Sequence, residues 1–291
     1  MNCFDISSLE GELKYRLTND MLFHIVMMES NKCLVSLLSS LLSVSVEEIT
    51  DVTILNPIDY YTCVDAKNII LDIKLEMNHT SITDIEMQVS KENYWANRTL
   101  FYSGRLIADQ NPGKNYEALK DVHHIGILDF IQKDNDAFYR SFRLMSEDGT
   151  VYSDKFQIHT LNLRNINNAL PADDRAGLVK WGRLFRARSW EEIRALADED
   201  AVFREVGENM RKAAVTQDDL LRRREDAIRD YEFGLSRARS MGRAEGIVEG
   251  RTEGLAENVK ALMDNLGLPF EKAAAALNIS AEDIEKIKKM L

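Results

Sequence analysis

Two carboxylates and an amide stand out between residues 69 and 89, where polar and apolar side chains alternate. Alternation with a period of two predicts strands that have one apolar and one polar face. The polar positions are Asp72, Lys74 and Glu76 in the first run, and Asp84, Glu86 and Gln88 in the second. The polar residues 78–80 lie between the runs and predict the turn of a β-hairpin.

The position of this turn decides which polar residues face each other. If the turn is centred on His79, residues whose numbers sum to 158 are paired, and Asp72 stands opposite Glu86 with Cβ atoms roughly 5 Å apart. Opposed carboxylates repel unless a cation offsets them, and hard divalent cations prefer carboxylate oxygens. The hairpin therefore predicts half of a metal site. The alternative is a merely solvated face of an antiparallel sheet, with Lys74 shielding its neighbours.

The Asp followed by Glu-x-Gln on the next strand resembles the PD-(D/E)XK nuclease fold, in a variant with Gln where most members carry Lys. More narrowly, the chain resembles the Rpn family of recombination-promoting nucleases and transposases. The segments that carry the resemblance occur in the expected order, at residues 18–23, 51–57, 71–74, 85–88, 98–106 and 113–116. Two departures from the family pattern are His24, where Lys is usual, and Leu-Asn-Leu at 161–163, where an acidic segment is usual.

The resemblance implies an α/β protein with a PD-(D/E)XK restriction-endonuclease-like mixed sheet flanked by helices, and a helical C-terminal extension. It implies that Asp72, Glu86, Gln88 and Asp20 form the catalytic set. Asp72, Glu86 and the backbone carbonyl of Met87 would hold Mg²⁺ or Mn²⁺, and Gln88 would orient the attacking water. An Asp in a first helical turn also stabilises the helix dipole, so Asp20 has a structural alternative.

A helical period begins near residue 92, directly after the Glu-x-Gln strand. Arg98 and Tyr102 are four residues apart and therefore lie on one helix face. A guanidinium can clamp a phosphate and a phenol can orient it, so we interpret the pair as substrate-binding. The alternative is an amphipathic helix whose Arg98 pairs with a nearby acid.

The remaining pattern predicts the elements around this hairpin. Thr18 is placed to cap a helix, residues 33–42 form a buried helix, and strands are expected at 51–55, 122–131, 137–145 and 155–163. His123 and His124 would point to opposite faces of their strand, so we interpret both as packing residues. We expect a nuclease-like domain at 1–165, a helical extension at 166–235, and a glycine-repeat helix with a small helical hairpin at 236–291.

Two features of the C-terminal half invite a functional interpretation. The basic triplet 222–224 is flanked by acids, which favours a solvated helix face over a nucleic-acid patch. Glycine recurs every four residues from Gly242 to Gly254, at a cost of about 1 kcal/mol each relative to Ala in a helix. Close approach of another helix would compensate, so we expect a homo-oligomer formed through this region.

Composition limits the function classes. The net charge is −11, and residues 1–165 carry −9 of it, which opposes tight nonspecific DNA binding, although Arg98 and Arg105 can attract phosphate locally. The three cysteines form no Cys-x-x-Cys pair, so a zinc site is not expected. No run of 18 apolar residues and no signal sequence is found, so we expect a cytoplasmic protein without a membrane partner.

These observations favour a magnesium-dependent DNA endonuclease that hydrolyses phosphodiester bonds in recombination or in the movement of mobile elements. The alternative is a non-catalytic regulatory or DNA-binding protein that retains the nuclease fold. The acidic balance and the Gln at position 88 favour the alternative, whereas the set Asp72, Glu86 and Gln88 favours the nuclease.

Overall fold

The computed structural model describes residues 4–56, 73–90, 94–110, 113, 115–132 and 135–291. The chain divides into two compact units, Met1–Ile228 and Arg229–Leu291. The expected boundary at 165/166 falls inside the first unit, where helices from both sides of that boundary share one hydrophobic core.

A six-stranded mixed sheet forms the centre of the first unit. Its strands are β1 (Val52–Ile54), β2 (Ile73–Met77), β3 (Ser81–Gln88), β4 (Asp121–Leu128), β5 (Tyr139–Met145) and β6 (Val151–Asn162), in the order β1-β2-β3-β4-β6-β5. The central strands β3, β4 and β6 are parallel, and the other neighbours are antiparallel. The carboxyl ends of β3 and β4 therefore meet at one edge, where ligands commonly bind in sheets of this kind.

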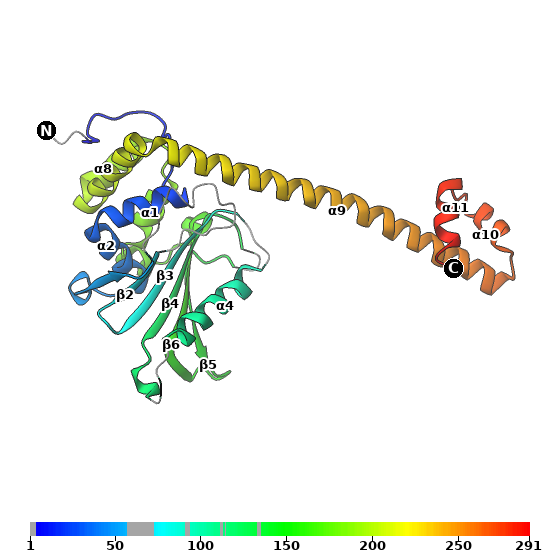
Figure 1. Cartoon of the computed structure of the whole chain (residues 1–291), viewed down its shortest axis with the longest axis horizontal. Coiled ribbons are helices and arrows are strands. Elements are labelled where there is room, and N and C mark those ends of the chain that lie inside the picture. Colours follow the sequence, from blue (N-terminus) through cyan, green and yellow to red (C-terminus); the bar gives the residue numbers. More distant parts are fainter. Residues whose placement is uncertain (1–3, 57–72, 91–93, 111–112, 114, 133–134) are drawn as a thin grey trace. The chain divides into compact units, whose positions relative to one another are not determined.

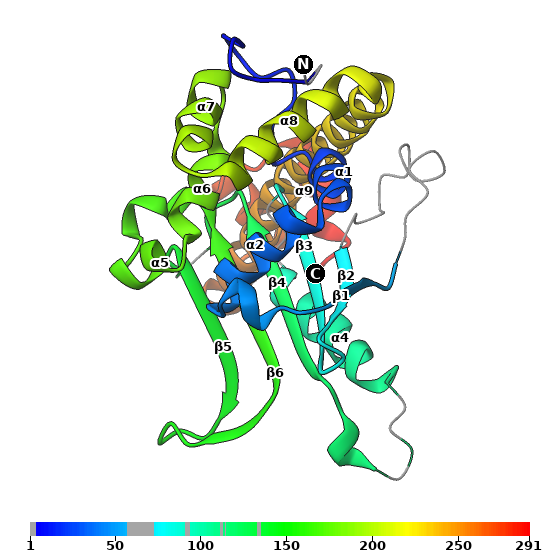
Figure 2. The ribbon, with the colours of Figure 1, turned by 90° about the vertical axis from the view of Figure 1, so that its left-hand side faces the viewer.

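Helices cover both faces of this sheet. Helices α1 (Asp20–Glu29) and α2 (Asn31–Leu42) lie on one face, and α4 (Trp95–Ala108) lies on the other (Figures 1 and 2). Helices α6 (Leu178–Arg186), α7 (Trp190–Glu199) and α8 (Ala201–Thr216) pack beyond α1 and α2. Short helices occur at Val46–Glu48 (η1), Tyr116–Ala118 (η2), Leu163–Asn168 (η3) and Pro171–Arg175 (α5). The predicted mixed sheet with flanking helices is confirmed.

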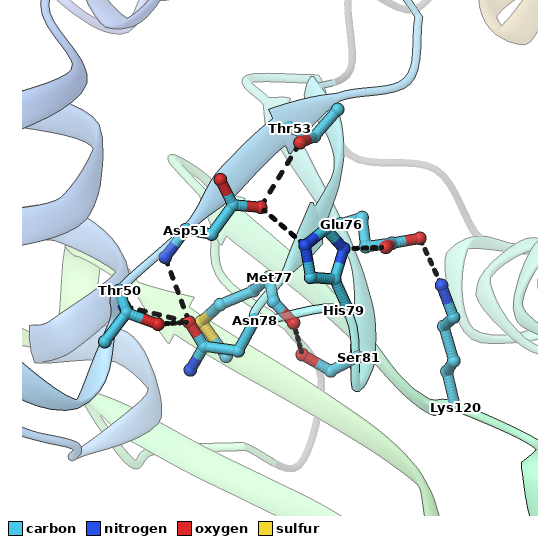
Figure 3. Close-up of polar contacts among 9 residues, drawn as sticks. All are labelled: Thr50, Asp51, Thr53, Glu76, Met77, Asn78, His79, Ser81 and Lys120. Atoms are coloured by element: carbon cyan, nitrogen blue, oxygen red, sulfur yellow. Dashed lines mark hydrogen bonds and ion pairs between the residues drawn. The ribbon is translucent and has the colours of Figure 1, made fainter.

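The turn of the β2–β3 hairpin is tied to the start of β1. Asn78 and His79 adopt left-handed backbone conformations, with φ of 52° and 58°, which Asn and His tolerate better than most residues. The Asn78 side chain accepts hydrogen bonds from the backbone of Thr50 and Asp51 and donates to the Glu48 carbonyl. Figure 3 shows the contacts of Asn78 with Thr50 and Asp51, and those of Glu76 with His79 and Lys120. The turn thereby pins the register of the hairpin.

The observed register agrees with the predicted one over the described residues. Ile73 pairs with Ile85, Lys74 with Asp84, and Met77 with Ser81, so each pair sums to 158. The predicted cap of the first helix is wrong, because the N-cap is Asn19, whose side chain accepts from the Leu22 amide. Asn19 takes that place because the helix begins at Asp20, one residue later than a Thr18 cap requires.

The second unit contains most of α9 (Asp218–Leu266), together with α10 (Phe270–Ala276) and α11 (Ala281–Lys288). Ala256 and Val259 of α9 form a small core with Ala273 and Ile287. Among the described helices, none is by itself long and apolar enough to cross a membrane; α1 and α2 meet the length and composition criteria only as a pair bent by 112°.

Candidate active site

A buried polar cluster lies at the carboxyl end of β3, beneath α4. Asp84 and Glu86 are 6% and 3% exposed, and Gln88 is half-buried. They share a strand face with Ile82, which packs against Leu106 of α4. The alternative of a solvated sheet face is therefore wrong for β3, because α4 covers the side that the alternation left polar.

Arg98 supplies the positive charge of this cluster. Its Nη2 donates a short hydrogen bond to Glu86 Oε1 and a second one, of 3.2 Å, to Gln88 Oε1. The side chains of Arg98 and Glu86 are 14% and 4% exposed. The amide nitrogen of Gln88 donates to the Ser90 carbonyl at 3.0 Å. Arg98 thus pairs with an acid, as the alternative interpretation expected, and the acid is one of the candidate catalytic residues.

His124 of β4 completes the cluster. Its Nδ1 lies 3.0 Å from Asp84 Oδ2, and its Nε2 lies 3.7 Å from Glu86 Oε2. The ring is 1% exposed and lies against Trp95 of α4, with ring centroids 6.3 Å apart. A Cβ at Gly126, the residue paired with Glu86, would meet the Trp95 ring at 2.5 Å. Glycine at 126 therefore allows the start of α4 to pack closely over the cluster.

Three other candidates have different surroundings. Asp72 lies outside the described residues. Tyr102 is 43% exposed, on α4 one turn beyond Arg98. The Met87 side chain is buried in the main core on the opposite face of β3, so only its backbone is available to a ligand at the cluster.

Asp20 forms a buried ion pair with a residue from α9. Arg224 donates from Nε to Asp20 Oδ1 at 3.0 Å and from Nη2 to Oδ2 at 2.5 Å. Arg224 is only 4% exposed, so the predicted solvated face at residues 222–224 is wrong at this position. Asp20 also accepts from the Met21 amide. In the described part of the chain, its contacts thus tie α1 to α9 and do not include Glu86 or Gln88.

The oxygen atoms of the cluster are suited to a hard cation. Glu86 Oε1 and Gln88 Oε1 accept hydrogen bonds from the same nitrogen of Arg98, so the two oxygens converge on one cationic position. Carboxylate and amide oxygens are the donors that Mg²⁺ and Mn²⁺ prefer. Within the described residues, no group of three His, Cys, Asp or Glu side chains is arranged as a metal site.

His124, which the sequence indicates only as a packing residue, contacts Asp84 and Glu86. The predicted opposite directions of His123 and His124 are observed, since His123 Nδ1 lies 3.2 Å from His159 Nε2 on the other face. The signal that identifies His124 is the parallel register, which pairs it with Asp84. That register depends on strand order, and strand order cannot be obtained from the alternation of side chains.

Comparison with known proteins identifies the family. No curated protein and no solved structure matches the chain significantly. The family model of the PD-(D/E)XK nuclease family transposases matches residues 17–238, which include the whole sheet, α4 and helices α5 to α8. The chain therefore belongs to the PD-(D/E)XK nuclease family transposases.

Proposed function

We propose that the protein is a magnesium-dependent DNA endonuclease, acting in recombination or in the movement of a mobile element. The observation that carries this proposal is the convergence of the Glu86 and Gln88 oxygens on one cationic group, in a chain of this nuclease family. DNA is the substrate expected of the family.

In this proposal Glu86, the Met87 carbonyl and Asp72, which the sequence predicts opposite Glu86, hold Mg²⁺ or Mn²⁺. A bound divalent ion supplies Lewis acidity and lowers the pKa of a coordinated water. Gln88 accepts a hydrogen bond from the attacking water and so orients it toward phosphorus. Asp84 and His124 keep the Glu86 carboxylate in place. Asp20 acts at a distance, by holding α1 and α9 together through Arg224.

Arg98 and Tyr102 are proposed to contact the substrate. With a divalent cation held at Glu86, the Arg98 guanidinium would be free to donate to a phosphate, which it could bind in bidentate fashion. Tyr102 is exposed one turn further along α4 and can donate to the same strand of DNA.

Cleavage of supercoiled plasmid by the full-length protein tests this function. We expect nicking with Mg²⁺ or Mn²⁺, none in EDTA, and none with Asp72→Ala or Glu86→Gln, while both variants keep the wild-type circular dichroism spectrum. Undiminished cleavage in EDTA would exclude the metal-dependent mechanism.

One observation favours a second candidate function, a non-catalytic regulatory or DNA-binding protein. Arg98 already donates to both the Glu86 and the Gln88 oxygens, as it would in a protein that never takes a metal there. Calorimetric titration with Mn²⁺ separates the two functions, because only the nuclease requires binding that is lost in Glu86→Gln.

A further inference from the structure

A pocket of about 600 Å³ lies beside the carboxyl end of β4 and concentrates positive charge. Its lining includes five arginines from three segments of the chain: Arg16, Arg164, Arg183, Arg186 and Arg188. Three acids also line it, which leaves a local surplus of two positive charges in a chain whose net charge is −11. A cationic cluster of this size in an acidic protein indicates a site for an anionic ligand.

Asp129 anchors the inner side of the pocket. Its carboxylate is 8% exposed and forms ion pairs with Arg164 Nε at 2.6 Å and Arg16 Nη2 at 4.0 Å. Arg164 Nε donates its hydrogen bond to the Asp129 backbone carbonyl, at 3.2 Å. The Asp129 amide donates to the Gln88 carbonyl at 3.0 Å. The pocket and the candidate active site therefore meet at the same edge of the sheet, one backbone hydrogen bond apart.

Asp129 does not balance the arginines that surround it. Burial is the main cause that holds the pKa of Arg16 below its ordinary value; Asp129 opposes this, while the cations of Arg188, Arg164 and Arg186 add to it. Arg16 Nε is buried and has no hydrogen-bond acceptor among the described residues. A bound anion would relieve this repulsion between like charges.

The outer side of the pocket presents guanidinium groups to solvent. Arg183 and Arg186 are three residues apart and lie on one face of α6, and Arg188 follows the helix; all three are exposed. In the described part of the chain, none of the three forms an ion pair. Of the two remaining acids, Glu192 accepts from the Arg188 backbone amide, and Glu199 pairs with Lys180, which is not among the lining residues.

We propose that this arginine pocket binds backbone phosphates of the DNA strand whose scissile bond lies at Gln88. Guanidinium forks match phosphate oxygens in geometry and charge. Because the whole-molecule charge repels DNA, a strand can be held only where positive charge is concentrated. The proposal rests on the nuclease function for the identity of the strand, but the binding itself needs no metal.

Fluorescence anisotropy with a labelled 20-base-pair duplex in EDTA tests the pocket. The full-length variant Arg183→Gln/Arg186→Gln should bind about 10-fold or more weakly, and the slope of log affinity against log salt should fall by about two. The matched control, Arg175→Gln/Arg237→Gln, removes two exposed arginines outside the pocket and should bind like the wild type. Both variants should keep the wild-type melting temperature, because the altered side chains are exposed.

Competition with free ligands distinguishes the source of the phosphate. Unlabelled duplex should displace the probe at micromolar concentration, and inorganic phosphate or ATP only at millimolar concentration. Equal affinity of the pocket variant and the wild type would overturn the proposal, and so would a variant that loses ATP binding while it keeps DNA binding. If the wild type binds DNA through the pocket but never cleaves it, the nuclease function is wrong, while the proposal that the pocket binds DNA phosphates is supported.

Discussion

The buried Glu86 carboxylate forms an ion pair with Arg98 beneath α4. A buried carboxylate without a partner is costly, and breaking a buried ion pair from one side typically costs 3–5 kcal/mol. Arg98→Ala should therefore lower the free energy of unfolding by about 3 kcal/mol, measured by urea denaturation. Arg105→Ala, which removes an exposed arginine from the same helix, should cost less than about 0.5 kcal/mol.

Arg98→Ala also tests metal binding without an activity assay. If Glu86 is a metal ligand, Mn²⁺ can replace the missing guanidinium and should raise the melting temperature of Arg98→Ala by more than that of the wild type. Equal shifts in both proteins would argue against a cation site at Glu86.

Gln88 permits a separate test of water positioning. Its amide contributes a dipole but no charge, so Gln88→Ala should slow single-turnover cleavage while Mn²⁺ affinity, measured by calorimetry, stays within about 2-fold. Gln88→Lys should stay active, because Lys has a similar reach and brings the charge that most members carry there. A folded, metal-bound but inactive Gln88→Lys would show that the reaction requires the amide itself.

At the residue scale, the sequence predicts residues with a local pattern but not their contacts with distant parts of the chain. Glu86 and Gln88 were found because their alternation with apolar neighbours is local. The contact of Arg98 with both of them required knowing that α4 crosses β3, and the pairing of Arg224 with Asp20 joins residues 204 positions apart. Such contacts are set by tertiary packing, for which the residue pattern carries no direct signal.

At the scale of elements, the sequence predicts the β2–β3 hairpin but not the packing of α4 on it. The turn residues Asn78 and His79 fix the register, and both lie within the pattern that predicted it. The same alternation left the α4 side of β3 polar, as on a solvated strand. It is buried because α4 packs on it, and its polar side chains contact Arg98 of α4 and His124 of β4.

The opposite face of the sheet carries a hydrogen-bonded chain that predicts a dependence on pH. Tyr139 donates to the Leu41 carbonyl, so His159 Nδ1 donates to Tyr139 at 2.7 Å and His159 Nε2 accepts from His123. Protonation of His159 would break this chain. Burial, followed by the nearby His123, Arg143 and His124, lowers the pKa of His159 from 6.5 to about 3.

The sign of the effect follows from this depressed pKa. Below pH 6.5 the unfolded chain binds a proton at His159 that the folded chain does not, so stability falls as the pH drops from 6.5 toward 3, by at most about 1.4 kcal/mol per pH unit. In urea titrations between pH 7.5 and 5, His159→Asn should show a shallower slope than the wild type. A wild-type slope in His159→Asn would contradict the assignment.

At the scale of the whole molecule, the evenly spaced glycines of α9 bear on the oligomeric state. An added Cβ at Gly242, Gly246, Gly250 or Gly254 would find no atom within 4 Å, so nothing described in this chain requires glycine there. Close packing of a second copy of the helix would require glycine at these positions. This leaves the predicted homo-oligomer as a proposal that the glycine repeat supports.

Substitution within the full-length chain tests that proposal. Gly246→Leu/Gly250→Leu should strengthen the isolated helix by about 1 kcal/mol per site but prevent close approach of a second one. Light scattering should show an oligomer for the wild type and a monomer for the variant. A variant with the wild-type mass would exclude the glycine stripe as the interface.

The most direct test of the central claim is the single-turnover cleavage rate of a labelled DNA duplex in Mg²⁺, compared between the wild type, Glu86→Gln and the exposed control Glu117→Gln. Gln keeps the size of Glu86 and removes only the charge that would hold the ion. We predict that Glu86→Gln is at least about 100-fold slower, while Glu117→Gln equals the wild type. Cleavage by Glu86→Gln at the wild-type rate would contradict the assignment of an active site to the end of β3.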